Sequence, residues 1–573
     1  MGAEDEPLDG RGDTGRAEGG GVAGGAVGGR AGRWRLPIRS QQVAPLPIRT
    51  RGTYDHAEGH LAAAVGDLRS WPAAKLAASP SSVDLPQKIK YNSSALNGGF
   101  MLIGREKEAK MLLSAMRSDK SEFVAVSGRR RVGKTYLVQE TFKNSFAFMH
   151  TGLSNEGMKR QLAEFRYSLE TASNGKVGRL GGWADAFHAL QEFLGGMPEG
   201  KKVVFIDEMP WMDTARSGFV SALEHFWNGW ANFRRDIVLV VCGSATSWII
   251  NKVINDHGGL HNRVTRQIRL KPFTLAECEL LAKRKGLRLN RTQILEGYMV
   301  MGGIPFYWDR LQKGESIAQG IDRLFVSADA EFAGEFDRLF ASLFKKPRIY
   351  VDVVTALSSR RCGKTRDELI AELKVEDNGA FSKVLRELEE CGFVARFNVP
   401  GRRIRDGTYQ LVDNYTLFYF KFLQGASKRE SGSWLQISGS QTGRIWCGFA
   451  FERVCLAHVA QMKKALGISG VITEEYAWRH FAEGEDDKGA QIDLVIERRD
   501  GVVNLCEMKY VRGRYAISPD YADRLAERAQ TFADKVAIDK AVFITMVTPN
   551  GIRQDENSSV VQSEITAADL FAD

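Results

Sequence analysis

Apolar and polar positions follow two different periods along the chain, and the periods predict most of its organisation. Continuous apolar runs typical of buried strands occur at EFVAVS (122–127), VVFID (203–207) and IVLVVCGS (237–244). Helical patterns separate them, as in SGFVSALEHFWNGW (217–230). Strands alternating with helices predict an α/β fold, with a parallel sheet covered by helices on both faces. From about residue 270 the pattern turns helical, through TLAECELLAKRKG and MVMGGIPFYWDRL.

The second half of the chain changes character twice. Residues 348–412 contain three amphipathic helical patterns, RIYVDVVTALSS, TRDELIAELK and NGAFSKVLRELEECGFV, followed by the hairpin pattern FVARFNVPGRRIRDGTYQLV. Three helices and a two-stranded wing predict a winged helix. A Gly- and Ser-rich stretch then leads to a second α/β segment. The expected parts are a disordered Gly/Arg-rich segment (1–98), an α/β core (99–270), a helical lid (271–345), a winged helix (346–423), a linker (424–443) and a C-terminal α/β domain (444–573).

Composition narrows the class of protein. The 573 residues are too many for one core, and 43% apolar with 26% charged residues is ordinary for a soluble protein. No apolar run approaches the roughly 18 residues that cross a bilayer, and no secretory h-region is visible. Seven cysteines without a CxxC pair indicate reduced thiols and a cytoplasmic location. The net charge of +9 is compatible with nucleic-acid binding without being evidence for it.

The N-terminal segment has a composition that cannot form a core. Residues 1–34 hold twelve glycines and almost no large apolar side chain, too few to offset the entropy of ordering the chain. Met101 opens the first organised segment, MLIGREKEAKMLLSAM. We expect the native start to lie near it and residues 1–98 to be dispensable.

A phosphate-binding loop follows the first strand. SGRRRVGKT (127–135) contains GxxxxGK[ST], with a strand before it and a helix after it. In this motif backbone N–H groups face the phosphates, Lys134 reaches the outer phosphates, and the Thr135 hydroxyl takes a Mg²⁺ position. At the end of VVFI, Asp207 supports Mg²⁺ and Glu208 orients the attacking water. The residues expected to hold ATP and Mg²⁺ are Gly128, Arg129, Arg130, Arg131, Val132, Gly133, Lys134, Thr135 and Asp207.

Three further features leave alternatives open. Ser244, at the end of the next strand, could sense the γ-phosphate or cap a helix. Arg263 is a candidate arginine finger, or a solvated side chain. The three arginines inside the loop, 129 to 131, could steer phosphate or face water, and water is the favoured alternative.

Five motifs together carry a family resemblance. IGREKE, GRRRVGKT, FIDEMPWM, the CGS turn and GGIPFYW resemble the archaeal-type ATPase family of the AAA+/STAND division over residues 101–345. The resemblance implies ATP binding and hydrolysis, and a winged helix followed by a C-terminal domain related to PD-(D/E)XK nucleases. GGIPFYW matches the family near the lid, although Gly302, Gly303 and Pro305 could serve only to shape a turn.

The C-terminal segment contains a hairpin with charged ends, QIDLVIERRDGVVNLCEMKY (491–510). A three-residue loop, Arg499-Asp500-Gly501, pairs 498 with 502 and therefore Asp493 with Glu507. The period of two puts Lys509 on the same face. Two facing carboxylates repel each other unless a cation lies between them, so Asp493 and Glu507 are candidate Mg²⁺ ligands. The alternative is a solvated sheet edge.

The resemblance adds Glu452, in GFAFERV, as the acid that the nuclease-like fold supplies from its first helix. Glu452, Asp493, Glu507 and Lys509 would then form a nuclease-type centre. Two functions follow: an ATPase coupled to a nuclease that acts on DNA or RNA, or a nucleotide-switched scaffold whose C-terminal domain only binds partners. The complete set of four residues favours the first function, which is the one we predict. The second is supported by the predicted recognition helix, where three glutamates outnumber Lys383 and Arg386. A second copy of the chain is the other candidate partner.

Overall fold

The computed structural model describes 102–143, 145–244, 246–254, 259–260, 262–360, 363–398, 407–426, 432–480, 482, 489–536 and 539–572. The expectations about residues 1–98 and about a start near Met101 lie outside these ranges.

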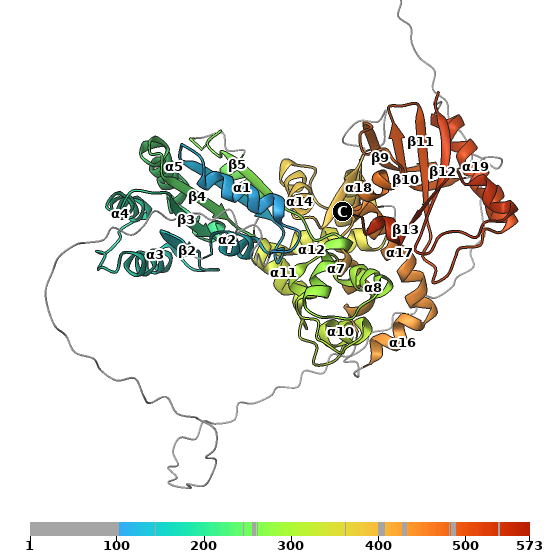
Figure 1. Ribbon diagram of the computed structural model, residues 1–573, viewed down its shortest axis with the longest axis horizontal. Helices are drawn as coiled ribbons and strands as arrows, with labels where there is room; N and C mark the ends of the chain where they lie inside the picture. Colours follow the sequence, from blue (N-terminus) through green and yellow to red (C-terminus); the bar gives the residue numbers. More distant parts are fainter. Residues whose placement is uncertain are drawn as a thin grey trace, which may run out of the picture. The chain divides into compact units, whose positions relative to one another are not determined.

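The first sheet has five parallel strands in the order β2-β3-β4-β1-β5 (Figure 1). The three strands expected from continuous apolar runs, β1, β3 and β4, are confirmed and buried at every position. Sequence patterns missed β2 and β5, because these outermost strands are short and alternate buried with more exposed residues. The strands are β1 (Glu122–Gly128), β2 (Phe148–Thr151), β3 (Lys202–Asp207), β4 (Ile237–Cys242) and β5 (Arg266–Leu270).

Helices cover both faces of this sheet, as the sequence predicts (Figure 1). Successive side chains of a buried strand point to opposite faces of the sheet, so they belong to two separate hydrophobic cores. One face packs on α1 (Glu106–Met116) and α2 (Lys134–Phe142). The other packs on α3 (Met158–Ser173), α4 (Trp183–Gly195) and α5 (Phe219–Gly229). A short α6 (Thr246–Ile249) follows β4.

The region after β5 is helical, as expected. It contains α7 (Leu275–Arg284), α8 (Arg291–Met301), α9 (Pro305–Trp308), α10 (Ile317–Ile321) and α11 (Glu335–Leu343). The three predicted amphipathic helices are α12 (Pro347–Ser358), α13 (Arg366–Leu373) and α14 (Gly379–Glu390). The predicted hairpin is present as β7 (Val394–Phe397) and β8 (Thr408–Leu411), joined by β6 (Lys364–Thr365) in an antiparallel sheet.

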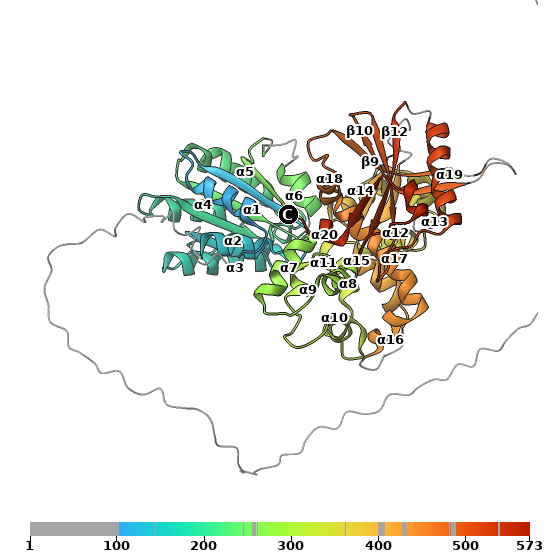
Figure 2. The same cartoon turned by 45° about the vertical axis from the view of Figure 1, so that its right-hand side comes forward.

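The second large sheet has the order β13-β12-β11-β10-β9 (Figure 2). Strands β9, β10 and β11 run antiparallel, while β11, β12 and β13 run parallel. Helix α19 packs on one face, and α17 and α18 pack on the other. The elements are α17 (Gln441–Ala457), α18 (Val459–Ala465), β9 (Thr473–His480), β10 (Ala490–Arg498), β11 (Val502–Met508), α19 (Pro519–Val536), β12 (Ala541–Thr548), β13 (Ser563–Thr566) and α20 (Ala567–Leu570).

The described part of the expected linker, 424–443, is largely helical. Helix α15 (Asn414–Phe418) precedes it, α16 (Ser433–Gly439) lies within it, and α17 begins at Gln441. The reason is burial: Trp434 is 4% exposed and packs against Phe418 and Trp446. The Asp322 carboxylate also accepts the backbone N–H of Trp434. One hydrophobic cluster therefore contains side chains from both ends of the described chain, including Leu102 and Phe571.

Two findings concern membrane-spanning helices and cysteine thiols. Among the described helices, none combines the length and the apolar character that crossing a bilayer requires. Within the described residues, free thiols are found at Cys242, Cys278, Cys391, Cys447, Cys455 and Cys506.

Candidate functional site

The phosphate-binding loop connects β1 to the N-terminus of α2. Gly133 precedes the helix with φ 89°, a left-handed conformation that favours glycine. Gly128 also has positive φ, and a Cβ there would lie 2.5 Å from the carbonyl oxygen of Leu270. Lys134 is 5% exposed and folds back over the loop, where its Nζ donates to the carbonyl oxygens of Gly128 (2.9 Å) and Arg129 (3.0 Å). The ammonium group is thus positioned where outer phosphates would lie.

A hydroxyl and a carboxylate meet at the start of α2. The Oγ1 of Thr135 donates to Oδ2 of Asp207 at 2.7 Å. Asp207 is the last residue of the buried strand β3 and is 4% exposed. Oxygen ligands of this kind, completed by phosphate and water, suit Mg²⁺. The two side chains thus fit the cation that the sequence predicts.

Glu208 and Ser244 are brought together from adjacent strands. One oxygen of Glu208, Oε2, accepts the backbone N–H (3.1 Å) and the hydroxyl (2.8 Å) of Ser244. Glu208 itself has the unusual φ of 47°, and its N–H donates to Oδ1 of Asp207. The Ser244 hydroxyl therefore contacts the carboxylate expected to orient water. This contact corresponds to neither of the two roles considered from sequence.

A cavity of about 450 Å³ is lined on one side by Lys134, Thr135, Glu208 and Ser244. Its other walls come from the segment before α1, from α2 and from α9. The lining residues that sequence reasoning did not assign to the site are Leu102, Ile103, Arg105, Tyr136, Phe273, Leu281, Pro305, Phe306 and Asp309. Two motifs signalled parts of these walls, since Ile103 and Arg105 belong to IGREKE, and Pro305 and Phe306 belong to GGIPFYW. Its glycine Gly303 instead packs tightly on Phe273, whose N–H donates to the Gly303 carbonyl oxygen at 2.6 Å.

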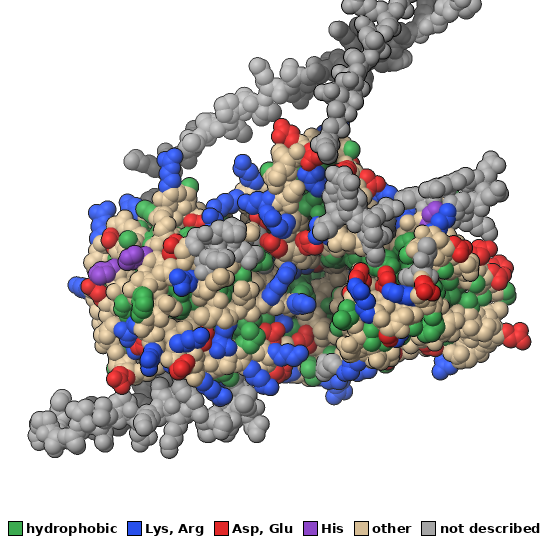
Figure 3. All heavy atoms as spheres, turned by 90° about the horizontal axis from the view of Figure 1, so that it is seen from above, with side chains coloured by type: hydrophobic (Ala, Val, Ile, Leu, Met, Phe, Trp, Pro, Cys, Tyr) green, Lys and Arg blue, Asp and Glu red, His purple; other side chains and the backbone are tan. Residues whose placement is uncertain are grey.

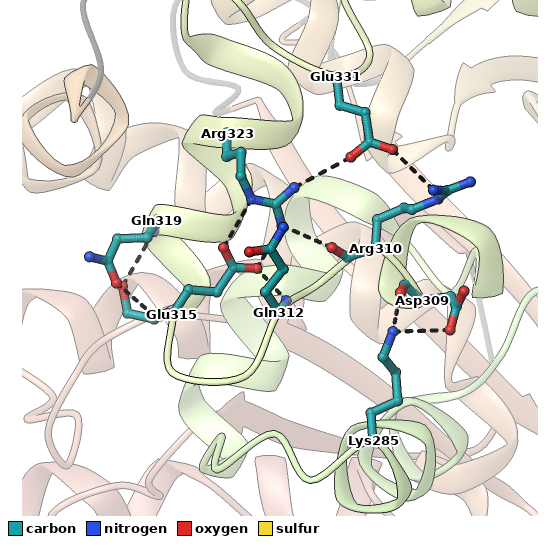
Figure 4. Close-up of polar contacts among 9 residues, drawn as sticks. Lys285, Asp309, Arg310, Gln312, Glu315, Gln319, Arg323 and Glu331 are labelled. Carbon is teal, nitrogen blue, oxygen red and sulfur yellow. Dashed lines mark hydrogen bonds and ion pairs between the residues drawn. The ribbon is translucent and has the colours of Figure 1, made fainter. Parts of the chain in front are cut away.

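A polar network supports the wall formed by α9 (Figure 4). Lys285, after α7, donates to the Oδ1 of Asp309 at 3.0 Å. Arg323 binds both oxygens of Glu315 and donates to the carbonyl oxygen of Arg310 at 2.8 Å. The network holds the segment 309–323 against the helices around it.

The loop arginines differ from the favoured expectation that they face water. The Arg129 side chain is 6% exposed and forms an ion pair with Asp413, directly after β8. Arg131 forms an ion pair with Glu335, which is 1% exposed, and lies over the Phe306 ring. Both arginines point into the helical region because buried carboxylates there need compensation. Arg130 lines the cavity.

Arg263 is exposed and lies in a turn before β5, where its N–H donates to the carbonyl oxygen of Leu260. Its proposed role as an arginine finger stays a prediction.

Residues 102–310 match the model of an ATPase domain found predominantly in Archaea. Together with the P-loop geometry, this match decides the assignment. Residues 102–310 are an archaeal-type ATPase domain. The chain is also similar to an uncharacterized protein of Methanocaldococcus jannaschii, with 22% identity over 403 residues, covering 69% of this chain and 84% of the relative.

Solved structures similar to this chain include a Walker-type ATPase of Pyrococcus abyssi, with 15% identity, a TM-score of 0.40, and coverage of 56% of this chain and 96% of that one. The ORC2 protein of Aeropyrum pernix, solved in ADPNP-ADP complexes, has 14% identity and a TM-score of 0.34, and covers 56% of this chain and 93% of its own. At these scores the superpositions are partial, and the ATPase domain is assigned from the family match.

The C-terminal hairpin has the predicted register. Leu494 pairs with Cys506 and Glu497 with Val503, and Gly501 has φ 84° in the turn between the strands. The pairing of β10 with β9 shifts register between Ile492 and Val495, a stretch that contains Asp493. A bulge changes the direction of side chains beyond it. Regular alternation therefore cannot be continued to Asp493.

Glu507 has more partners than the sequence suggested. Its carboxylate accepts from Lys509 Nζ (2.6 Å), the Tyr521 hydroxyl (2.6 Å) and Arg528 Nη1 (3.1 Å). Burial raises the pKa of Glu507, but Lys509, Tyr521 and Arg528 outweigh burial and leave that pKa below its usual value. Lys509, expected on the same face as Glu507, is joined by two further donors that α19 supplies.

The other two predicted acids, Glu452 and Asp493, both lie near Cys455 of α17. The charges of Glu452 and Asp493 both contribute, after burial, to raising the pKa of Cys455, which packs on the α17 face. Across the described residues, no group of three or more His, Cys, Asp and Glu side chains lies close enough to hold a metal. The structure therefore does not gather Glu452, Asp493 and Glu507 into one cation site.

Proposed function

We propose that the chain is a nucleotide-switched ATPase. It binds ATP at the loop from Gly128 to Thr135, with Mg²⁺ held by Thr135 and Asp207, and hydrolyses it with Glu208 orienting the water. Ser244 holds one oxygen of Glu208, so a phosphate that contacts Ser244 would also move this carboxylate. The family match and the loop geometry support nucleotide binding.

One observation carries the switching part of the proposal: the loop is tied to the hairpin formed by β7 and β8. Arg129 lies between the two ends of this hairpin, with its guanidinium 4.6 Å from the Phe393 ring centre and paired with Asp413. The N–H of Val412 donates to the carbonyl oxygen of Phe393 at 2.9 Å and closes the hairpin base. A phosphate that reshapes the loop would therefore act directly on the hairpin.

The buried ion pair is more suited to specifying an arrangement than to stabilising the fold. Removing both charges from water is costly, and such pairs often add little net stability. Asp413 also caps α15 by accepting the N–H of Thr416 at 2.9 Å. We assign residues 346–423 as a winged helix, supported by three helices and an antiparallel hairpin, and infer that it receives the nucleotide signal.

Hydrogen exchange of residues 393–398 and 407–418 tests the switch, with no nucleotide, with ADP and with a non-hydrolysable ATP analogue. We expect nucleotide to change protection there in the wild type. Asp413→Asn keeps the α15 cap but removes the charge, and we expect it to bind nucleotide without transmitting the change. The double variant Arg129→Met/Asp413→Asn, which leaves no unpaired charge, should behave in the same way.

Asp236→Asn is the matched control. It breaks a partly buried ion pair with Lys202 at the opposite end of the same sheet, and its hairpin should still respond to nucleotide. A wild-type hairpin indifferent to nucleotide would refute the switch while leaving ATP binding intact.

Nucleic-acid cleavage by the C-terminal domain is the second candidate function. Helix α17, the antiparallel strands β9 to β11, and α19 before the parallel strand β12 support a nuclease-like fold for residues 444–573. The contacts of Glu507 favour a binding module instead, since Lys509 and Arg528 already neutralise it. On the face of the molecule shown in Figure 3, positive and negative side chains are interspersed, so this face gives no specific support to nucleic-acid binding. A divalent-dependent cleavage assay on DNA and RNA decides: activity lost in Asp493→Ala and Lys509→Ala would establish the nuclease.

A further inference from the structure

Cys242 is a buried thiol beside the ATPase centre that the proposed chemistry does not use. It is the last residue of β4, pairs with Val126 of β1, and is 0% exposed. Its side chain does not only pack: the S–H donates to Oδ1 of Asp207. A small buried cysteine is ordinarily a packing residue, so this contact with a candidate Mg²⁺ ligand is informative.

The two oxygens of the Asp207 carboxylate have different donors. Oδ1 accepts the Cys242 thiol and the backbone N–H of Glu208, the latter at 2.8 Å. Within the described part of the chain, Oδ2 accepts only the Thr135 hydroxyl. The Thr135 hydroxyl is also the group expected to turn toward Mg²⁺. Once it turns, the donors at Oδ1 remain and keep the carboxylate in its orientation.

A thiol that donates its hydrogen to Oδ1 can orient the carboxylate without occupying Oδ2, the oxygen beside Thr135.

We propose that Cys242 is a positioning residue, whose S–H holds Oδ1 of Asp207 so that Oδ2 faces the Mg²⁺ position beside Thr135. This inference rests on the proposed ATPase function. It separates two properties of the site. The affinity for nucleotide without metal depends on the loop and on Lys134, whereas the response to Mg²⁺ depends also on Cys242.

The test compares Cys242→Ser, Cys242→Ala and Cys242→Val in the full chain. Serine keeps an O–H donor, alanine removes donor and volume, and valine fills the space without a donor. Two quantities are measured: ADP affinity in EDTA, and the Mg²⁺ concentration that gives half of the Mg²⁺-dependent rise in melting temperature with ADP. A Mg²⁺ titration of ATP hydrolysis accompanies them.

We expect Cys242→Ala and Cys242→Val to raise the half-saturating Mg²⁺ concentration about five-fold, the size expected for one hydrogen bond from a weak thiol donor. Affinity in EDTA should not change, and Cys242→Ser should stay within about two-fold of wild type by the same reasoning. Cys506→Ala, which removes a fully buried thiol from β11, is the control and should leave both quantities at wild-type values.

Equal Mg²⁺ dependence in the wild type and in the valine variant would overturn the positioning role. So would a serine variant as impaired as valine, because that result would indicate packing alone. A wild-type protein that binds no nucleotide would overturn the proposed function itself, and this outcome is distinguishable because it appears before any variant is compared.

Discussion

The ATPase loop region and the C-terminal hairpin each contain a carboxylate near the end of a strand, but the donors around the two carboxylates differ. Asp207 and Glu507 both lie at or near the end of a buried strand. Among the described residues, Asp207 accepts from a hydroxyl, a thiol and a backbone N–H, and its partners Thr135 and Glu208 line a cavity of about 450 Å³. Glu507 accepts from two cations and a phenol. Neutral donors leave the negative charge of a carboxylate uncompensated, so it can attract a cation. Two cationic partners already compensate the charge of the other carboxylate.

The sharpest test of the first centre is Lys134→Ala. Among the described residues, the ammonium group donates to the loop carbonyl oxygens of Gly128 and Arg129 and pairs with no carboxylate, so its charge is available to phosphates. Its loss should weaken ATP binding by about 100-fold or more, since hydrogen bonds to charged groups are the stronger ones. Calorimetric titration with ATP and Mg²⁺ measures this. Unchanged affinity would remove the loop from the nucleotide site.

Glu208→Gln separates turnover from binding at the same centre. The amide can keep the Ser244 contact but cannot accept a proton, so ATP hydrolysis should fall about 100-fold or more. Nucleotide affinity should stay within a few-fold, because Asp207 and Thr135 are intact. Steady-state phosphate release and equilibrium binding give the two numbers. A variant with wild-type turnover would show that another group orients the water.

Glu507→Gln tests whether the C-terminal centre is a group of ion pairs or a metal site. A metal site would remove the difference between the two centres. The structure predicts destabilisation by about 1.5 kcal/mol, because the buried carboxylate loses its charged hydrogen bonds while Lys509 and Arg528, each about one-third exposed, can reach water. Mg²⁺ should not shift the melting temperature of wild type or variant through this site. The exposed Glu556→Gln is the control. A gain in stability, or a Mg²⁺-dependent rise in melting temperature lost in the Glu507 variant alone, would contradict the ion-pair assignment.

The smallest expected effect concerns acid stability at the junction of α17 and α7. His458 is fully buried, its Nε2 accepts the N–H of Leu275 at 3.0 Å, and burial lowers the pKa of His458 to about 4. Because the folded pKa lies below the unfolded value of about 6.5, this stabilisation is complete above pH 6.5 and is lost as pH falls toward 4.

Melting temperatures at pH 7.5 and 5.0 measure the effect. His458→Gln should reduce the difference between the two pH values, while the exposed His188→Gln should not change it. An unchanged difference in the His458 variant would assign the acid sensitivity elsewhere, with His150 the next candidate because burial also lowers the pKa of His150 to about 4.

Local signals were sufficient wherever a feature depended on neighbours in the chain. Continuous apolar runs predicted β1, β3 and β4, and the loop with Gly501 predicted the register of β10 with β11. They failed at β2 and β5, whose alternating exposure depends on being edge strands. They also failed at 433–439, which becomes helical because Trp434 finds a buried aromatic site.

The sequence by itself determined the ATPase loop, because GxxxxGK[ST] between a strand and a helix specifies its own backbone geometry. Only the tertiary structure decided which partners the charged side chains take. Asp413 lies 284 residues after Arg129, and Tyr521 and Arg528 reach Glu507 from a helix on the face of its sheet. The physical reason is that a buried charge must be compensated by whatever folding brings near, and no local pattern encodes that neighbour.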